Sequence, residues 1–339
     1  MTILVTGGLG YIGSHTVVEL LNNNFDVVII DDLSNTEKFI LKNIEEITGK
    51  KPIFYPFDLK RKELLKQVFD AHKIEGCIHF AAYKAVGESQ EKPIDYYENN
   101  LFSLINLLQE MKERNISNFI FSSSCTVYGQ ADTMPIDENT PLKLPESSYG
   151  KTKQMGEEIL KDFATAHQKK VTLLRYFNPI GAHPSAKLGE LPIGIPNNLV
   201  PYVMQTAAGV REKLSVWGND YETEDGTAIR DYIYVVDLAK AHVKALQKLI
   251  SENSETLVDI YNLGTGKGSS VLEVVHAFEK ANDVAVPYQI CERRAGDITI
   301  AYANADKAEK ELGWKSETSL EEALRTVWQW QKYLETREK

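Results

Sequence analysis

The sequence predicts an α/β protein, a doubly wound parallel sheet followed by a smaller mixed α/β lobe. Two observations lead to this prediction. Short, continuous apolar runs, typical of strands buried on both faces, alternate with stretches of helical period. After about Pro179 the texture changes, because the segment Gly181–Pro201 contains four prolines and cannot form one long helix or strand.

The predicted strands are short and apolar, and amphipathic segments separate them. Each strand–helix alternation adds one parallel strand to a sheet that helices cover on both faces. We expect strands at Ile3–Val5, Val27–Ile30, Gly76–Phe80, Asn118–Phe121 and Val171–Leu174, and helices at Tyr11–Leu21, at Lys62–His72, at Asn99–Lys112 and from Tyr149 to Leu160.

Composition and charge exclude several classes of protein. Of the 339 residues, 43% are hydrophobic and 25% are charged, which are ordinary values for a globular chain. No apolar run is long enough to span a membrane, and the N-terminus does not resemble a signal peptide. The net charge of −10 argues against a general nucleic-acid binder. The cysteines, Cys77, Cys125 and Cys291, are widely spaced, which argues against a disulfide framework or a metal site and favours the cytoplasm.

A glycine-rich turn follows the first strand and opens the first helix. Gly7, Gly10 and Gly13 form a GxxGxxG pattern, and glycine permits a tight turn and a close backbone approach to a pyrophosphate. The N–H groups at the helix N-terminus then face the phosphates. Asp31 ends the second strand, where a carboxylate can bind the adenosine ribose and repel the 2′-phosphate of NADP. The pattern predicts NAD rather than NADP, with Asp32 as the competing candidate for the ribose.

These features also predict how the chain divides. Residues 1–180 are expected to form a Rossmann-type NAD-binding domain, and residues 181–339 a second lobe. We expect the chain to return to the first domain near residues 232–263.

Tyr149 and Lys153 lie four residues apart at the start of a helical segment, so they share one helix face. A positive charge about 4 Å from a phenol, at an effective dielectric near 20, stabilises the phenolate by roughly 4 kcal/mol, or about 3 pKa units before desolvation. The spacing therefore predicts a tyrosine base that works near neutral pH, although a surface Tyr–Lys pair gives the same pattern. Ser122–Ser124 end another strand, where a hydroxyl can bind a substrate oxygen or simply complete a turn.

Several motifs run along the whole chain. The first half contains TGGLGYIGSH, Asp58-Leu59, FAAYKAVGES, SSSCTVYG and YFNPIGAHP. Together with Asp31, Asn99 and the Tyr149–Lys153 pair, they resemble the extended short-chain dehydrogenase/reductase family. The second half contains GIPNNLVP, VWGNDY, DGTAIRDY, YNLGTG and RRAGD, which resemble the UDP-hexose 4-epimerases of that family.

The resemblance implies an NAD site spread over the first half of the chain. Backbone groups of the turn would contact the pyrophosphate, Asp31 and Asn35 would lie near the adenosine ribose, and Lys153 would bind the nicotinamide ribose. The implied cofactor residues are Gly7, Gly10, Tyr11, Ile12, Gly13, Asp31, Asn35, Asp58, Leu59, Phe80, Ala81, Ala82, Lys84, Asn99, Ser122, Tyr149, Lys153 and Phe177.

The resemblance further implies that residues 181–339 bind a UDP-hexose. Arg230 and Arg294 would neutralise its diphosphate, so the acidic chain needs only local cations, and Arg293 is expected in a surface ion pair. The implied substrate residues are Ser124, Tyr149, Asn178, Asn198, Leu199, Val216, Trp217, Arg230, Tyr232, Arg294, Asp297 and Ala301.

The implied reaction interconverts UDP-galactose and UDP-glucose. Tyr149 would take the C4 hydroxyl proton while the C4 hydride moves to NAD; the 4-keto sugar would then turn over and regain the hydride on its other face. Ala301, where some relatives carry tyrosine, would leave room for UDP-GlcNAc and UDP-GalNAc. The resemblance also implies a homodimer, built on the helix containing Leu101–Leu108 and on the helix after Tyr149.

Four alternative functions stay open at this point. They are another nucleotide-sugar 4-epimerase, a 4,6-dehydratase, a uronate epimerase or decarboxylase, and an NAD sensor without catalysis. A dehydratase needs an acid–base pair directly after the catalytic serine, and Cys125 and Thr126 cannot supply one.

Overall fold

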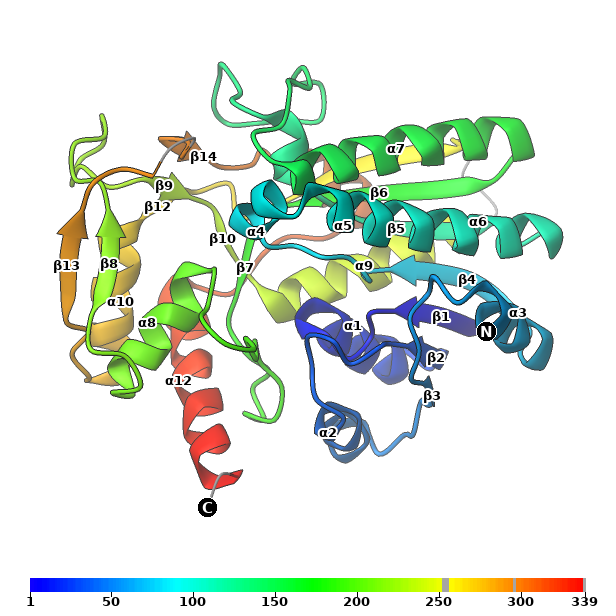
Figure 1. Ribbon diagram of the computed structural model, residues 1–339, viewed down its shortest axis with the longest axis horizontal. Coiled ribbons are helices and arrows are strands. Elements are labelled where there is room, and N and C mark those ends of the chain that lie inside the picture. The colour runs from blue at the N-terminus through cyan, green and yellow to red at the C-terminus, as the bar shows by residue number, and fades with distance from the viewer. Residues whose placement is uncertain (252–255, 295–296, 338–339) are drawn as a thin grey trace.

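A parallel sheet forms the centre of the protein (Figure 1). The computed structural model describes residues 1–251, 256–294 and 297–337. Within them the strand order of this sheet is β11-β6-β5-β4-β1-β2-β3, and all neighbours pair in parallel. The predicted fold class is therefore confirmed. The strands are β1 (Thr2–Thr6), β2 (Asp26–Ile30), β3 (Ile53–Tyr55), β4 (Ile74–His79), β5 (Asn118–Ser124), β6 (Lys170–Tyr176) and β11 (Val258–Leu263).

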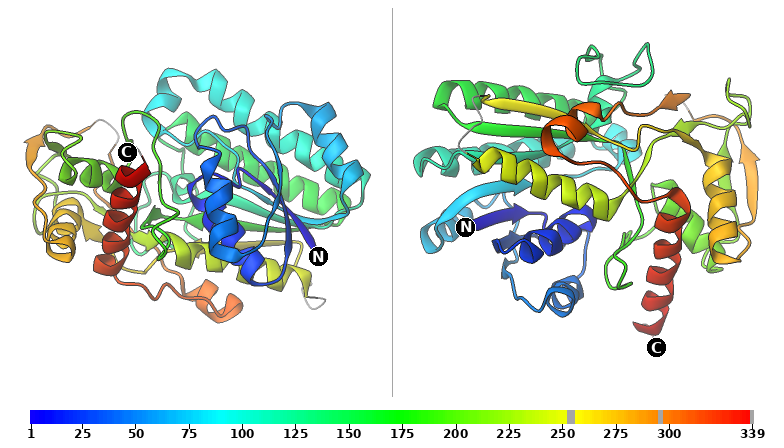
Figure 2. Two further views of the ribbon diagram at one scale, coloured as in Figure 1. Left: turned by 90° about the horizontal axis from the view of Figure 1, so that it is seen from below. Right: turned by 180° about the vertical axis from the view of Figure 1, so that it is seen from behind.

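Two separate cores cover the two faces of this sheet. Ile3 and Val5 of β1 belong to the core formed with α1, α2 and α9, whereas Leu4 belongs to the core formed with α3, α6 and α7. Helices therefore lie on both faces (Figure 2), which is why the strands are continuous apolar runs. The helices are α1 (Tyr11–Asn22), α2 (Phe39–Thr48), α3 (Lys62–Ala71), α6 (Ser103–Glu113), α7 (Ser148–His167) and α9 (Val235–Ile250).

The second part of the chain lies beyond the carboxyl ends of the large sheet (Figure 1). Its strands form the sheets β10-β7, β12-β9-β14 and β13-β8. The chain returns to the large sheet through α9 and β11, which pairs with β6. The further elements are β7 (Asn178–Ile180), β8 (Leu214–Trp217), β9 (Ile229–Arg230), β10 (Tyr232–Tyr234), β12 (Ser269–Ser270), β13 (Tyr288–Cys291), β14 (Ile300–Ala301), α4 (Val86–Glu91), α5 (Pro93–Tyr97), α8 (Leu199–Ala207), α10 (Val271–Asn282), α11 (Asp306–Leu312) and α12 (Leu320–Arg337).

Three local features differ from the sequence-based expectation. The predicted helix at Asn99–Lys112 begins with a π-helical turn, Glu98–Phe102, before α6. The edge strand β3 has only three residues, too few to form a recognisable apolar run. The proline-rich segment ends at α8, which accepts Pro201 in its first turn because the N–H groups there lack helical partners.

The topology places ligand sites at the carboxyl edge of the sheet. β1 lies between β2 and β4, so the strand order reverses at β1, and such a point in a doubly wound sheet opens a crevice for ligands. The loops that leave this edge carry most of the residues predicted to bind the cofactor. Among the described residues, no helix has the length and apolar character needed to cross a membrane.

Candidate active site

The glycine-rich turn forms a cradle at the N-terminus of α1. Gly7 has φ +68°, and a Cβ there would lie 2.8 Å from the backbone N of Ala81. A Cβ on Gly13 would lie 2.1 Å from the Gly7 carbonyl oxygen. Side chains are therefore sterically excluded at both positions, while the first N–H groups of α1, including those of Tyr11 and Ile12, need partners from outside the helix. A dinucleotide pyrophosphate fits such a cradle.

Asp31 braces this turn. Its Oδ2 accepts a hydrogen bond from the N–H of Leu9 at 3.0 Å, and its Oδ1 accepts one from Leu33 at 3.0 Å. Burial raises the pKa of Asp31, and the two backbone donors oppose that rise. Asp32 instead accepts from Ser34 in an exposed loop. The structure therefore ties Asp31, and not its neighbour, to the turn.

Most of the other residues predicted to bind the cofactor lie at or just after the carboxyl ends of strands, and Asn99 is an exception. Ser122 lies in β5, and Asn99, in the π-helical turn, is buried and donates to Asn100. Phe177 follows β6 and packs in a small core with Tyr128. The remaining ones are Asn35 after β2, Asp58 and Leu59 after β3, and Phe80, Ala81, Ala82 and Lys84 after β4.

Tyr149 and Lys153, on α7, meet the end of β5. The Nζ of Lys153 donates to the carbonyl oxygen of Ser122 at 2.6 Å and lies 5.8 Å from the centre of the Tyr149 ring. The phenol of Tyr149 is hydrogen-bonded to Ser124. The Ser124 Oγ also accepts from the N–H of Thr126 at 3.2 Å. An acid–base group, a cation and an orienting hydroxyl therefore meet at one point.

The pKa of Tyr149 differs from the expectation of a phenolate near neutrality. Burial raises the pKa of Tyr149 to about 12, although the hydrogen bond with Ser124 lowers it. Burial also lowers the pKa of Lys153 to about 7. Desolvation outweighs the charge of Lys153, which directs its ammonium to the Ser122 carbonyl. A tyrosine base that works near neutral pH therefore stays a prediction, which also depends on the charge of the nicotinamide ring.

Arg230 and Arg294 converge on one carboxylate. The Nη2 of Arg230 donates to Asp297 Oδ1 at 2.7 Å, and the Nη2 of Arg294 donates to Asp297 Oδ2 at 3.1 Å. Arg294 also lies 6.0 Å from the ring of Trp217, which is exposed. Arg293 points elsewhere, to Asp220, as the surface-pair interpretation predicts. Two cations that share one anion leave a net positive charge for a diphosphate.

The arginine cluster lies within electrostatic reach of the end of β5. Arg230 is close enough to Cys125, the residue after Ser124, to lower the pKa of its thiol, although burial dominates and raises that pKa to about 11. β9 and β14 pair so that Ala301 lies opposite Arg230. The two halves of the chain therefore contribute to one site.

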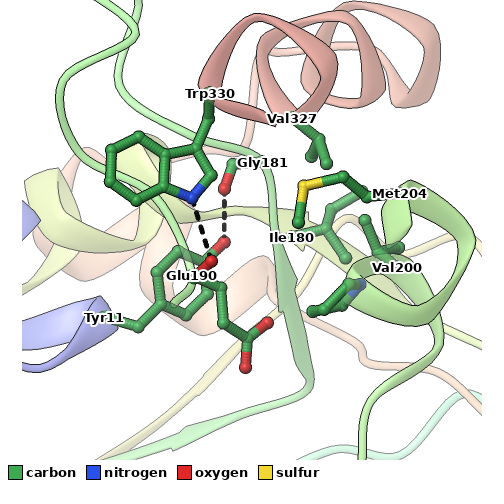
Figure 3. Close-up of a pocket in the computed structure, with 9 residues that line it drawn as sticks. Tyr11, Ile180, Gly181, Glu190, Val200, Met204, Val327 and Trp330 are labelled. Atoms are coloured by element: carbon green, nitrogen blue, oxygen red, sulfur yellow. Dashed lines mark hydrogen bonds between the residues drawn. The ribbon is translucent and has the colours of Figure 1, made fainter. Parts of the chain in front are cut away.

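Glu190 was not predicted, yet it connects residues from both halves. Lys84 and Asn198 each donate to its Oε1 at 2.9 Å. Its carbonyl oxygen accepts from the indole N–H of Trp330, next to Tyr11, whose hydroxyl donates to Gly181 (Figure 3). Glu190 is the single acidic residue between positions 181 and 198, which is the signal that could have found it.

The remaining residues predicted to bind substrate differ in exposure. Asn178 begins β7, and Leu199 is the first residue of α8. Val216 and Tyr232 are buried. The Val216 side chain packs in the large core, so only its backbone could reach a ligand. Side chains alternate along a strand, and the side chain of the next residue, Trp217, is exposed. In the described part of the chain, His, Cys, Asp and Glu residues form no cluster that could hold a metal ion.

Known proteins resemble this chain over nearly its full length. A protein-family model described as GDP-mannose 4,6 dehydratase matches residues 4–327. A curated UDP-glucose 4-epimerase from Bacillus subtilis is 53% identical over 332 residues, or 98% of this chain and 97% of the relative. A crystal structure of UDP-glucose 4-epimerase from Bifidobacterium longum in complex with NAD+ and UDP is 48% identical, with a TM-score of 0.94 and 98% of both chains covered. A structure from Stenotrophomonas maltophila with bound NAD and formylated UDP-arabinopyranose is 44% identical, with a TM-score of 0.96 and 99% of both chains covered.

Replacing Asp31 with alanine should release NAD. The change leaves the N–H of Leu9 in the turn and the N–H of Leu33 after β2 without a charged acceptor, and each such hydrogen bond contributes about 1.5–3 kcal/mol. We expect the NAD content of the purified protein, measured after denaturation, to fall at least about ten-fold. Asp32→Ala is the matched control and should keep the wild-type content; equal losses in the two variants would contradict the assignment.

Proposed function

We propose that this chain, which belongs to the UDP-glucose 4-epimerase family, is an NAD-dependent isomerase that interconverts UDP-galactose and UDP-glucose. One observation carries the proposal: the Tyr149–Lys153–Ser124 cluster lies at the end of β5, and the next residue, Cys125, is within electrostatic reach of Arg230, which shares Asp297 with Arg294. An acid–base group and a position suited to a diphosphate therefore lie in the same part of the molecule.

The chain's own residues provide proton transfer and positioning. When bound, NAD takes a hydride from hexose C4 and gives it back. Tyr149 accepts the C4 hydroxyl proton and later returns it, while Ser124 hydrogen-bonds along that path. Because the pKa of Tyr149 is about 12 in the protein alone, positive charge close to the phenol is required for proton transfer at neutral pH. The positively charged nicotinamide ring would add such a charge to that of Lys153.

The substrate is held mainly at its uridine diphosphate end. Arg230 and Arg294 bind the diphosphate, and Trp217 offers an exposed ring to the uracil. Binding energy from this non-reacting part leaves the hexose free to turn. The 4-keto sugar can then present its other face, which inverts C4 when the hydride returns.

A 4,6-dehydratase is the second candidate, because the matching family model carries that description. Elimination of water needs an acid–base pair beside the reacting sugar. Cys125 and Thr126 occupy those positions, and the pKa of the Cys125 thiol is raised to about 11 by burial. The thiol is therefore protonated at neutral pH, and the residues favour the epimerase.

The two parts of the chain have different roles in this proposal. Residues 1–180, with the returning segment 232–263, bind NAD, and the rest of residues 181–339 bind the UDP-sugar. The carboxylate of Asp31, held beside the glycine-rich turn, would repel the 2′-phosphate of NADP and so supports NAD as the cofactor. The free cysteines favour work in the cytoplasm. Conversion of UDP-galactose would place the chain in galactose metabolism.

A homodimer accounts for an exposed apolar surface on the π-helical turn, α6 and α7. Phe102 is 55% exposed, Ile105 37% and Met155 44%. Phe102 and Ile105 lie three residues apart and so share one helix face. A second copy of the chain would cover this surface.

Tyr149→Phe should abolish turnover without releasing NAD. The phenyl ring keeps the packing and removes the group that carries the proton. We expect conversion of UDP-galactose to UDP-glucose, assayed without added NAD, to fall at least about a hundred-fold, with the NAD content unchanged. A variant that keeps near-normal turnover would exclude Tyr149 as the base, and a wild-type protein inactive even with added NAD would exclude the epimerase.

Ala301→Tyr tests the size of the hexose site. Ala301 is buried on β14 opposite Arg230, whereas the backbone of Tyr302 bonds to Ile136. We propose that the small side chain admits UDP-GlcNAc and UDP-GalNAc. The larger ring should lower kcat/KM for the acetylated pair at least about ten-fold more than for the plain pair. A wild-type protein that does not convert UDP-GlcNAc would refute the proposal.

Phe102→Glu should separate the proposed dimer. A charge buried at a subunit contact without a partner costs several kcal/mol, so light scattering should give the mass of one chain for the variant and two for the wild type. Val210→Glu, at an exposed apolar residue after α8, is the control and should leave the mass unchanged. A monomeric wild type would overturn the homodimer.

A further inference from the structure

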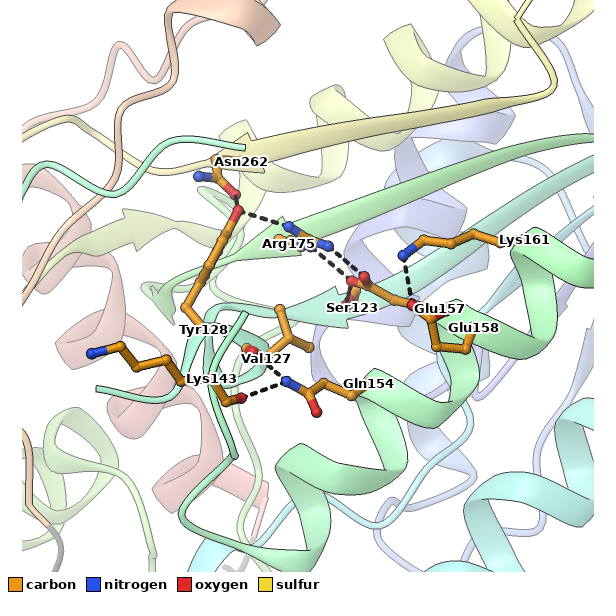
Figure 4. Close-up of polar contacts among 10 residues, drawn as sticks. All are labelled: Ser123, Val127, Tyr128, Lys143, Gln154, Glu157, Glu158, Lys161, Arg175 and Asn262. Atoms are coloured by element: carbon orange, nitrogen blue, oxygen red, sulfur yellow. Dashed lines mark hydrogen bonds and ion pairs between the residues drawn. The ribbon is translucent and has the colours of Figure 1, made fainter. Parts of the chain in front are cut away.

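A buried ion pair between Arg175 on β6 and Glu157 on α7 lies next to Ser123 of β5 (Figure 4). Arg175, on β6, donates from Nε to Glu157 Oε1 at 2.8 Å and from Nη2 to Oε2 at 2.5 Å. The side chains are 2% and 0% exposed. Such a pair gains little net stability over apolar residues of the same volume. Its position therefore suggests a role beyond stability.

Glu157 joins α7, which carries Tyr149 and Lys153, to β5, which carries Ser124. Its Oε1 also accepts from the hydroxyl of Ser123 at 2.6 Å. Ser123 lies between Ser122, whose carbonyl oxygen accepts from Lys153, and Ser124. One carboxylate on α7 therefore fixes the segment of β5 that carries both contacts of the site.

Tyr149, Lys153 and Glu157 follow one another at intervals of four residues, so they lie along one face of α7. The negative charge of Glu157 raises the pKa of Lys153, against the burial that lowers it. The same carboxylate thus acts on the position of Lys153 and on its charge.

We infer that Glu157 is a positioning residue for the proposed epimerase reaction. Fixed by Arg175 and Ser123, it sets the register of α7 on β5 and places a negative charge one helical turn from Lys153. The inference rests on the proposed function, in which Lys153 and Tyr149 act at the hexose.

Hydrogen bonds continue from this ion pair to the substrate side of the molecule. The Nη1 of Arg175 donates to the Tyr128 hydroxyl at 3.0 Å, and that hydroxyl donates to Asn262 Oδ1 at 2.7 Å. The side chain of Asn262 donates to the carbonyl oxygen of Ile136, whose N–H donates to Tyr302, next to Ala301. The network therefore links α7 to the strand at the hexose end.

Glu157 is the negatively charged group that favours the ammonium form of Lys153, because its other described neighbours are neutral at pH 7. Burial lowers the pKa of His79 to about 3 and raises the pKa of Tyr176, so both are neutral at pH 7. Tyr149 is also protonated in the protein alone. In the described chain, the titratable groups that interact with Lys153 are Tyr149 and Glu157 on α7 and His79 on β4. Tyr176, on β6, contacts the side chain of Ser122, whose carbonyl oxygen accepts from Lys153.

Glu157→Gln keeps the shape of the side chain and removes its charge. We expect kcat for UDP-galactose to fall about ten-fold, with KM within two-fold because the diphosphate contacts are unchanged. Lys153 should lose its proton more readily, and a neutral Lys153 no longer favours the phenolate. The basic limb of the kcat–pH profile, where activity is lost as Lys153 gives up its proton, should therefore move to lower pH.

Glu110→Gln is the matched control. Glu110, on α6, is also buried and pairs with an arginine four residues later, Arg114, away from β5. Its replacement should lower the melting temperature while leaving kcat and the pH profile unchanged. A purely structural Glu157 would behave in the same way, and that outcome in a folded Glu157→Gln protein would overturn the inference.

Two further measurements keep the test decisive. Ser123→Ala removes only the hydroxyl and retains both charges, so kcat should fall about three-fold without a shift of the pH profile. If Glu157→Gln does not fold, wild-type kcat in Ser123→Ala overturns the inference. The titration of Lys153, read from the side-chain NMR signal that Lys153→Met removes, needs no turnover. It should move to lower pH in Glu157→Gln, because Glu157 raises the pKa of Lys153; an unchanged titration refutes the inference even if the epimerase assignment itself fails.

Discussion

A parallel sheet brings the ends of its strands to one edge, and the backbone N–H groups of the loops that leave this edge must find acceptors inside the protein. Buried carboxylates supply many of them here. Asp31 holds the glycine-rich turn through Leu9. Asp231, fully buried, accepts from the N–H groups of Thr265 at 2.9 Å, Gly266 at 3.2 Å and Ala303 at 3.1 Å. Each carboxylate fixes a loop that carries residues of the site.

These carboxylates explain how a rigid site can form from separate segments. Asp231 follows Arg230 directly, so the carboxylate that holds the Thr265 loop also fixes the backbone beside Arg230, the residue proposed to bind the diphosphate. Burial raises the pKa of Asp231, and its donors oppose that rise. Replacing such an acceptor would leave several donors unsatisfied at once, which costs more than the loss of one bond. The same reasoning applies to Glu157, whose donors are side chains of two adjacent strands.

The sequence predicted the features that depend on local pattern. It missed those that depend on how deeply a side chain is buried and on contacts between segments far apart in the chain. Five strands of the large sheet, the turn at Gly7 and the helix after Tyr149 follow from apolar period and glycine spacing, whereas β3 and β11 were not predicted. The pKa of Tyr149 could not be predicted, because it depends on burial and on the direction of Lys153. Glu190 joins segments that are 106 residues apart at Lys84, and no local pattern encodes that contact.

The distribution of charge explains how an acidic protein can bind an anionic substrate and still move a proton. At the diphosphate end, Arg230 and Arg294 share Asp297, so the local charge is positive although the chain carries −10. At the hexose end, burial favours the neutral forms of Tyr149 and Lys153. Strong attraction is therefore confined to the part of the substrate that does not react. The reacting end needs no charged contact of its own, and because burial raises the pKa of Tyr149 to about 12, its proton moves near neutral pH only when positive charge is added beside the phenol.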